Sequence, residues 1–251
     1  MLIDTHAHLF IEILNQDLDG IIERARESGV TKFIVPGLNL ETSQQAIALA
    51  KRFPGIVYAS VGIHPEEEPA SKNHVALLEK LIEKNRKWVT AVGEIGTDAN
   101  TTEIYQRMDQ QKELMRLQCE IAIRNDLPVI IHTRKSLLET WDVLDSLRNM
   151  PRGVFHSFSH DEEGMNEILK RGFYIGFGGS VSYSKRIQNI AKIIPNDKYL
   201  LETDAPFLPR DFLNEPSSVT ILASHVANLR GESVNTIANE TTNNARKLFN
   251  I

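Results

Sequence analysis

Short apolar stretches alternate with longer amphipathic stretches along the whole chain. The short stretches are rich in β-branched and aromatic residues and end near Gly or Pro, which is the pattern of buried strands. Eight such stretches are predicted as strands: Met1–Thr5, Lys32–Pro36, Val57–Gly62, Val89–Gly93, Pro128–Ile131, Gly153–Phe155, Phe173–Phe177 and Tyr199–Thr203. The segments between them repeat apolar residues every three or four positions and are predicted as helices: Gln16–Ser28, Thr42–Arg52, Asn73–Lys84, Glu103–Asn125, Leu137–Arg148, Glu162–Arg171 and Lys185–Ile193.

This alternation predicts a parallel sheet, and eight repeats with short connections are the number that closes a barrel. Pro and Gly are scattered at element ends and do not form a linker, so we expect a single domain over residues 1–251. Two further helices, Ser217–Leu229 and Ser233–Phe249, follow the last strand. The predicted fold is an α/β (β/α)8 TIM-type barrel with an extra C-terminal helix, and a doubly wound open sheet is the alternative that periodicity leaves open.

Composition narrows the class of protein. The 28 Lys and Arg residues against 33 Asp and Glu residues give a net charge of −5, unlike a basic nucleic-acid coat protein. A lone Cys119 cannot form an internal disulfide, and the chain contains no apolar run of the ~18 residues that a membrane span needs. We therefore expect a cytoplasmic globular protein with no membrane association and no obligatory protein partner.

Side chains that bind metals or transfer protons follow most of the predicted strands. They lie in the segments Asp4-Thr5-His6-Ala7-His8, Gly62-Ile63-His64-Pro65, Gly93-Glu94-Ile95-Gly96-Thr97-Asp98, Ile131-His132-Thr133-Arg134, Phe155-His156-Ser157 and Glu202-Thr203-Asp204-Ala205-Pro206. The carboxyl ends of the strands of a parallel barrel meet on one face, where such enzymes perform their chemistry. We therefore expect residues about 200 positions apart in the sequence to be neighbours.

These side chains form a set of metal ligands. His6 and His8 are two residues apart on an extended segment, so both project to the same side. A single buried His is more often a hydrogen-bonded core residue than a ligand, but His132 and His156 would face this pair. Four imidazoles with two carboxylates provide nitrogen and oxygen ligands for two divalent ions, and a shared carboxylate can bridge them.

In order and spacing, these motifs resemble those of the TatD family of metal-dependent hydrolases and deoxyribonucleases, in the amidohydrolase superfamily. The resemblance covers essentially the whole chain. It implies that one group of residues binds one metal ion: His6, His8 and Asp204. It implies that His132 and His156 bind a second ion, with Glu94 bridging the two. Val89–Glu94 contains no Lys, which favours this branch over those that use a carboxylated lysine as the bridge.

The resemblance also implies an activity. Two divalent ions, drawn from Zn, Mn, Mg, Co or Fe, would hold a bridging hydroxide that cleaves a phosphodiester bond in a 3′-5′ exonuclease reaction on DNA or another phosphodiester. Asp204 would act as the general base, Glu94 would serve catalysis as the bridge, and His64 and Arg134 would contact the substrate. The alternative is hydrolysis of a carboxylic ester or amide, such as removal of D-amino acids from tRNA. A barrel retained only for protein binding is a third reading, but it would not need this full set of ligands.

Two segments depart from the family pattern, and we expect both to affect which substrate is preferred. Asp98 is followed by Ala99-Asn100, where the family commonly has an aromatic residue, and Asp211-Phe212-Leu213 stands where a basic stretch is usual. Two interpretations concern supporting residues. Glu202 is expected to be a buried acid that accepts hydrogen bonds. Three residues on one face of the long predicted helix are expected to pack against the barrel: Gln111, Met115 and Gln118.

Overall fold

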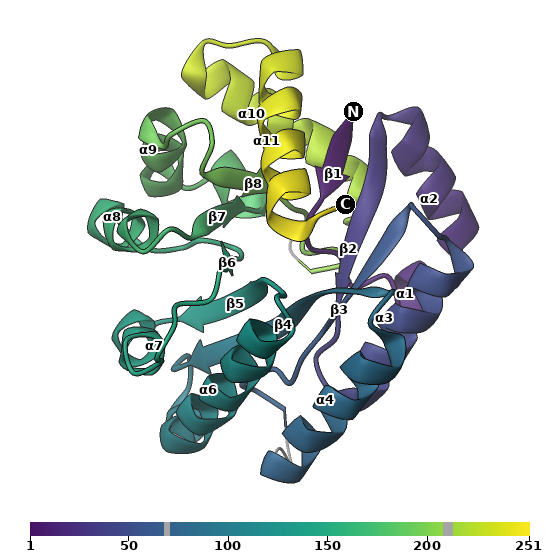
Figure 1. Ribbon diagram of the computed structural model, residues 1–251. Coiled ribbons are helices and arrows are strands. Elements are labelled where there is room, and N and C mark those ends of the chain that lie inside the picture. Colours follow the sequence, from purple (N-terminus) through teal and green to yellow (C-terminus); the bar gives the residue numbers. More distant parts are fainter. Residues whose placement is uncertain (68–70, 208–212) are drawn as a thin grey trace.

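Eight parallel strands form one sheet in the computed structural model, which describes residues 1–67, 71–207 and 213–251 (Figure 1). Each strand pairs with the next one in the sequence, from the first to the eighth. The strands are β1 (Leu2–Asp4), β2 (Val30–Pro36), β3 (Val57–Val61), β4 (Val89–Asp98), β5 (Val129–Arg134), β6 (Gly153–Phe155), β7 (Tyr174–Phe177) and β8 (Tyr199–Leu201). The predicted order of strands is therefore confirmed.

Backbone hydrogen bonds between the segments after β1 and β8 close the barrel. The amide of Thr5 donates to the carbonyl of Leu201 at 3.2 Å, and the amide of Asp204 donates to the carbonyl of His6 at 2.9 Å. The amide of His8 then donates to the carbonyl of Ala205 at 2.7 Å. An open doubly wound sheet would leave these edges apart, so the barrel is the correct alternative.

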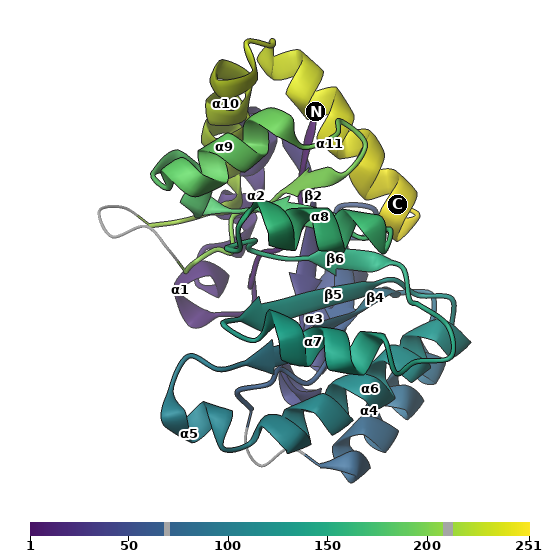
Figure 2. The ribbon, with the colours of Figure 1, turned by 90° about the vertical axis from the view of Figure 1, so that its left-hand side faces the viewer.

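Helices surround the sheet (Figure 2). They are α1 (Glu12–Asn15), α2 (Leu18–Glu27), α3 (Leu40–Arg52), α4 (Lys72–Asn85), α5 (Thr102–Tyr105), α6 (Met108–Arg124), α7 (Leu137–Leu144), α8 (Glu162–Lys170), α9 (Lys185–Ile193), α10 (Val219–Arg230) and α11 (Val234–Phe249), with 3-10 turns η1 (Gly179–Ser182) and η2 (Pro216–Ser218). Local sequence sets several boundaries. Asn39 and Thr42 form a capping box at the start of α3, and Gly231 ends α10 with a φ of 67°. None of the helices in these described ranges is long and apolar enough to cross a membrane.

Several predicted elements were wrong in extent, among them the strand predicted to end at Ile131, which continues to Arg134. The predicted helix Glu103–Asn125 is two helices, α5 and α6, because Arg107 leaves the helical backbone region with a φ of −99° and a ψ of 15°. The strand predicted to end at Gly93 continues to Asp98, so Glu94 lies within β4 and not after it. Hydrophobic periodicity reports burial, and the polar end of a strand buried inside a protein therefore looks like a loop.

Buried apolar residues form two separate layers. The outer layer lies between the strands and the surrounding helices. The inner layer fills the barrel and takes residues from seven strands: Ile3, Ile34, Ala91, Ile130, Val154, Tyr174 and Leu200. Ala245, Leu248 and Phe249 of α11 pack against this inner layer. The extra C-terminal helix thus covers the end of the barrel where the strands begin (Figure 1).

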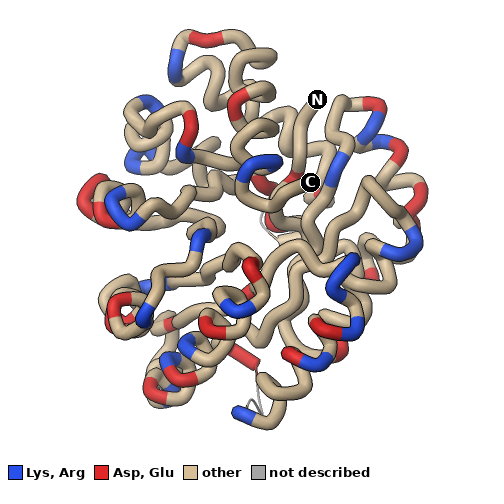
Figure 3. The backbone as a smooth tube through the Cα atoms, viewed as in Figure 1, with Lys and Arg blue, Asp and Glu red and all other residues tan. Residues whose placement is uncertain are grey.

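Charged residues of both signs are interspersed over the outer helices (Figure 3). Several pairs bridge neighbouring elements, such as Lys112 with Asp142 at 2.8 Å and Arg171 with Asp145 at 3.0 Å. Exposed pairs of this kind contribute little stability, so the barrel depends mainly on its two apolar layers.

Replacing Phe249 tests the role of α11. Phe249 is 2% exposed, so Phe249→Ala should lower the free energy of unfolding by about 3 kcal/mol through lost burial and a residual cavity. Val234→Ala, on the same helix at a side chain that is 42% exposed, should change it by less than about 0.5 kcal/mol. Urea denaturation followed by circular dichroism measures both values, and equal midpoints for the two variants would contradict this role.

Candidate functional site

The inner faces of three strands lead from the apolar layer directly to the polar site. Side chains alternate along a strand, so the residue two positions beyond an inner apolar residue also points into the barrel. By this rule His132 follows Ile130 and His156 follows Val154. Glu202 follows Leu200 in the same way. Ligand-type side chains therefore form a layer above the apolar one, at the carboxyl ends of the strands.

Glu94 reaches the same layer through a β-bulge. Val92 pairs with Val129 and Ile95 pairs with Ile131, so β4 has one more residue than β5 between these two pairs. The extra residue reverses the alternation and turns Glu94 inward. Gly96 is required beside it, because a Cβ there would lie 1.8 Å from the carbonyl oxygen of His132.

Four imidazoles surround the buried carboxylate of Glu94, which is 3% exposed. Its Oε1 lies 2.8 Å from His156 Nε2, 2.9 Å from His132 Nδ1 and 3.3 Å from His64 Nε2. Its Oε2 lies 3.1 Å from His6 Nε2. These residues come from segments after β1, β3 and β6 and from within β4 and β5, so only the closed barrel brings them together.

His8 and Asp204 complete the side of the site next to His6. The Nε2 atoms of His6 and His8 are 3.2 Å apart. Asp204 Oδ1 lies 3.4 Å from His8 Nε2 and 3.7 Å from His6 Nε2. The backbone of Asp204 is in the left-handed region with a φ of 57°, which Asp tolerates better than most residues. All the side chains that the sequence suggested as metal ligands therefore lie in one cluster.

Other carboxylates hold these candidate ligands in place. Asp98 Oδ2 is 2.8 Å from His132 Nε2, which leaves Nδ1 of that ring facing Glu94. Asp4 Oδ1 accepts hydrogen bonds from the amides of His6 at 3.2 Å and Thr203 at 3.0 Å. Such partners fix the orientation and the reactive nitrogen of a ligand. Asp4 and Asp98 stand within the sequence motifs, but their roles depend on contacts with Thr203 and His132, which lie on distant segments of the chain.

Glu202 is a buried acceptor, as expected. Its Oε1 accepts a hydrogen bond from the amide of Ser157 and lies 3.5 Å from His156 Nδ1. Gly176 of β7 leaves space for this carboxylate, since a Cβ there would lie 2.5 Å from Glu202 Oε2. The glycine-rich end of β7 thus lets Glu202 approach closely from β8.

The buried acids and imidazoles of the site shift one another's pKa values. Burial alone would raise the pKa of Glu94, but the neighbouring imidazoles, above all His156 and His6, lower it well below its ordinary value. Burial alone would likewise lower the pKa values of His156 and His132. Glu94 and Glu202 raise that of His156 well above the usual range, and Asp98 and Glu94 raise that of His132. The buried carboxylates therefore favour the protonated forms of His132 and His156 when no cation is bound.

The donor set fits divalent cations. Among the residues that the structure describes, three groups of side chains offer ligand atoms within 4.8 Å of one another: His6, His8 and Asp204; His64, Glu94 and His132; and His6, His156 and Glu202. Nitrogen and carboxylate oxygen donors suit Zn, Mn, Co or Fe and do not exclude Mg. The sequence suggested His64 as a substrate contact. Its Nε2 atom lies 3.3 Å from Glu94 Oε1, so His64 is also close enough to Glu94 to serve as a further metal ligand.

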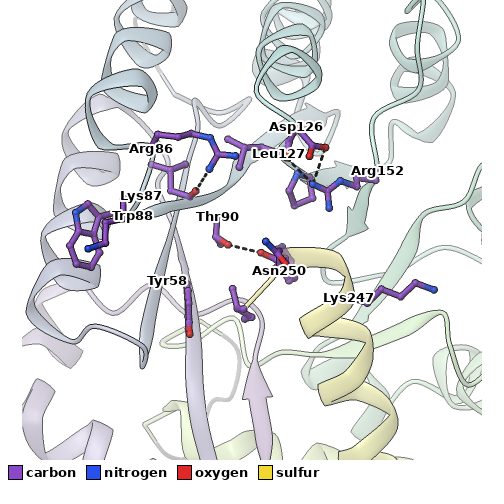
Figure 4. Close-up of a pocket in the computed structure, with 14 residues that line it drawn as sticks. Tyr58, Arg86, Lys87, Trp88, Thr90, Asp126, Leu127, Arg152, Lys247 and Asn250 are labelled. Atoms are coloured by element: carbon purple, nitrogen blue, oxygen red, sulfur yellow. Dashed lines mark hydrogen bonds and ion pairs between the residues drawn. The ribbon is translucent and has the colours of Figure 1, made fainter.

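A cavity of about 570 Å³ opens above this cluster. Arg134, which is exposed, lines this cavity together with two exposed aromatic residues, Tyr183 and Phe207. A second cavity of about 650 Å³ lies at the opposite end, where β4 and β5 begin (Figure 4). It is lined by Arg86, Lys87, Arg152 and Lys247 and by no histidine, so the ligand-type side chains belong to the first cavity.

Comparison with known proteins agrees with this geometry. Residues 3–250 match the model of a family described as TatD related DNase. The chain belongs to the TatD family. A metal-dependent hydrolase of Bacillus subtilis, YabD, is 36% identical over all of both chains, and a 3′-5′ ssDNA/RNA exonuclease TatD of Erwinia tasmaniensis is 34% identical over 94% of this chain and 95% of its own. The structure of YjjV, a TatD homologue of Escherichia coli, superposes with a TM-score of 0.92 at 31% identity, covering 100% of this chain and 98% of that one. As a TatD protein the chain is a hydrolase.

Two loops near the site contain the segments that depart from the family pattern. Ala99 and Asn100 follow Asp98 directly, and the amide of Asn100 donates to Asp98 Oδ1 at 2.6 Å. The second segment that departs from the family pattern is Asp211-Phe212-Leu213, and its first two residues lie outside the described part of the chain. Asn214 is buried and donates to the carbonyl oxygens of Thr203 and Phe207 at 2.9 and 2.6 Å, which ties this loop to the segment that carries Asp204.

The raised pKa values of His132 and His156 predict that metal binding releases protons. The raised pKa values favour the protonated form of these rings in the metal-free protein, whereas a ligand imidazole must be neutral, so binding of an ion should release protons. The affinity for Mn²⁺ or Zn²⁺ should therefore rise as the pH increases through the raised pKa values. Isothermal titration in two buffers with different ionisation enthalpies measures the protons released, and identical heats in both buffers would contradict the prediction.

Proposed function

We propose that this TatD-family hydrolase is a divalent-metal-dependent 3′-5′ exonuclease that cleaves phosphodiester bonds of DNA. The observation that carries the proposal is the convergence of His6, His64, His132 and His156 on one buried carboxylate, Glu94, at the mouth of the barrel, with His8 and Asp204 beside His6. Relatives at 34% identity bear the name 3′-5′ ssDNA/RNA exonuclease, which favours a nucleic acid over an aminoacyl ester as the substrate.

The proposed ligands divide into two sets around Glu94. His6, His8 and Asp204 would hold one ion, and His132 and His156 would hold the second, with Glu94 shared between them. Two divalent ions supply Lewis-acid activation of a water molecule and stabilise the charge that develops at phosphorus. The number of ions and their identity are part of this proposal.

Asp204 is the proposed general base. Its side chain is 15% exposed towards the cavity, whereas that of Glu94 is only 4% exposed. Burial alone would raise the pKa of Asp204, but hydrogen bonding to His8 and the charges of His6 and His156 lower it. The carboxylate is therefore ionised at neutral pH and can accept a proton from the attacking water.

The cavity wall offers groups that suit a single nucleic-acid strand. We assign Arg134, exposed at the rim, to a substrate phosphate, because an Arg guanidinium binds phosphate oxygens in a bidentate manner. His64 would contact a second substrate oxygen, or it would join His132 and Glu94 in binding the second ion. Phe207 and Tyr183 are 47% and 71% exposed, and such rings stack with unpaired bases. The net charge of −5 does not oppose this function, because bound cations would add positive charge at the site.

We also propose that residues 1–251 act as one domain and that the enzyme works in the cytoplasm on DNA. The lone Cys119 supports this location, since an internal disulfide is not available. The second cavity, whose lining differs in charge from the first, has no part in this reaction scheme.

A substrate panel tests the reaction class. Single-stranded DNA labelled at its 5′ end, a generic phosphodiester and a D-aminoacyl ester of tRNA would each be incubated with Mn²⁺, Mg²⁺ or Zn²⁺. We expect a ladder of DNA products shortened stepwise from the 3′ end and no product after chelation of the metal. Cleavage of the aminoacyl ester alone would instead identify the carboxylic ester alternative.

Replacing Asp204 tests the general base. Asp204→Asn keeps the shape of the side chain but removes the proton acceptor, and it should reduce kcat by about 10²- to 10⁴-fold. Asp197→Asn, at an exposed carboxylate remote from the site, is the matched control and should leave kcat unchanged. Both variants should retain the circular dichroism spectrum of the wild type. Wild-type kcat in Asp204→Asn would remove Asp204 from proton transfer.

A further inference from the structure

Two buried glutamines lie on one face of α6, which packs against β4 (Figure 2). Gln111 is 2% exposed and Gln118 is 0% exposed. They are seven residues apart, which is two helical turns or about 10 Å along the axis, so both face the barrel. From the sequence, both are expected to pack against the barrel in the same way as Met115, which lies between them. Met115 is an apolar core residue, but both glutamines form hydrogen bonds with the backbone beside the candidate site.

Gln118 holds the residue before His64. The amide of Ile63 donates to Gln118 Oε1 at 2.7 Å, and Gln118 Nε2 donates back to the carbonyl of Ile63 at 3.1 Å. A side-chain amide can accept and donate at once, so one glutamine satisfies both backbone groups of a single residue. This pair of bonds fixes the peptide planes on both sides of Ile63 and therefore the direction in which His64 leaves the chain.

Gln111 holds Asp98 in the same way. The amide of Asp98 donates to Gln111 Oε1 at 2.7 Å, and Gln111 Nε2 donates to the carbonyl of Asp98 at 3.1 Å and to that of Ile104 at 2.8 Å. Asp98 in turn fixes His132 through its contact with Nε2. Gln111 thus acts on the ring that faces Glu94 through one intermediate residue.

The other side of the site is held differently. His6 and Asp204 flank a connection between the segments after β1 and β8, where Asp4 accepts hydrogen bonds from the amides of His6 and Thr203 and from the hydroxyl of Thr203 at 2.5 Å. No residue of α6 takes part in these bonds. The two sides of the site therefore have separate supports.

We propose that Gln111 and Gln118 are positioning residues through which α6 sets the geometry of His132 and His64, and only of that side of the site. In terms of the function proposed above, on which this inference rests, they tune the group formed by His64, Glu94 and His132, in which His64 would join the ligands of the second ion, and leave the group of His6, His8 and Asp204 unaffected. Losing a partner that orients a ligand typically weakens metal binding by about 10- to 100-fold.

Metal titration of single variants tests the proposal. Gln111→Met and Gln118→Met keep the length and burial of the side chain but remove its hydrogen bonds. Each should weaken one of the two Co²⁺-binding steps by about 10- to 100-fold in isothermal titration and leave the other step unchanged. Gln111→Glu and Gln118→Glu keep an acceptor for the backbone amide but have no donor for the carbonyl, and they replace any Met variant that fails to fold.

Met115→Ala is the matched control. It removes a buried side chain from the same face of α6 and should lower the melting temperature while leaving both Co²⁺-binding steps unchanged. If Met115→Ala and the glutamine variants weaken the same step equally, α6 acts only through packing and the proposal is wrong. Wild-type binding in both glutamine variants would overturn it as well.

A measurement on metal-free protein separates this inference from the proposed function. Long-range ¹H–¹⁵N spectra of histidine rings report the protonated nitrogens of each imidazole. Gln111→Met should change the signals of His132 and leave those of His8 as in the wild type, and unchanged His132 signals would overturn the positioning role. Wild-type protein that binds no second ion would overturn the two-ion function, while the histidine spectra would still decide the role of Gln111.

Discussion

The buried carboxylate of Glu94 is the group on which the rest of the site depends. A carboxylate that is 3% exposed is costly unless positive charge or hydrogen bonds compensate it. Four imidazoles from different strands provide that compensation, and the same imidazoles and the carboxylate can instead share divalent ions. The closed barrel is needed for either arrangement, because the ligands are contributed by strand ends spread around its whole circumference.

The barrel separates stability from chemistry along its axis. At the end where the strands begin, α11 covers the inner apolar layer with Leu248 and Phe249. Two positions further along β5, β6 and β8, the inward side chains become His132, His156 and Glu202. An apolar layer directly beneath the ligands excludes water from one side of the site, so the ligands open only to the cavity at the mouth. This division is typical of TIM barrels, in which activity belongs to the carboxyl ends of the strands.

A second set of residues supports the candidate ligands and the backbone beside them without facing the cavity. Asp4 ties the segment after β1 to the segment after β8, and Asp98 orients His132. Gln111 and Gln118 connect the helix α6 to the backbone beside these groups. Each of these residues is buried and makes at least two hydrogen bonds. Such hydrogen bonds keep the geometry of a site fixed although the charged groups within it repel or attract one another.

The sequence by itself determined the order of strands and helices and the six metal-ligand candidates, because inner-face periodicity and polar residues at strand ends are local features. It also determined that α10 and α11 follow the last strand. Only the tertiary structure decided that Glu94 points inward, because the bulge in β4 is defined by its pairing with β5. The hydrogen bonds of Gln111 and Gln118 could likewise not be predicted from the sequence. Both glutamines lie on the same helix face as Met115, and this spacing indicates burial without indicating a hydrogen-bond partner. Periodicity shows which side of an element is buried, whereas the partner of a polar group depends on a contact between distant segments.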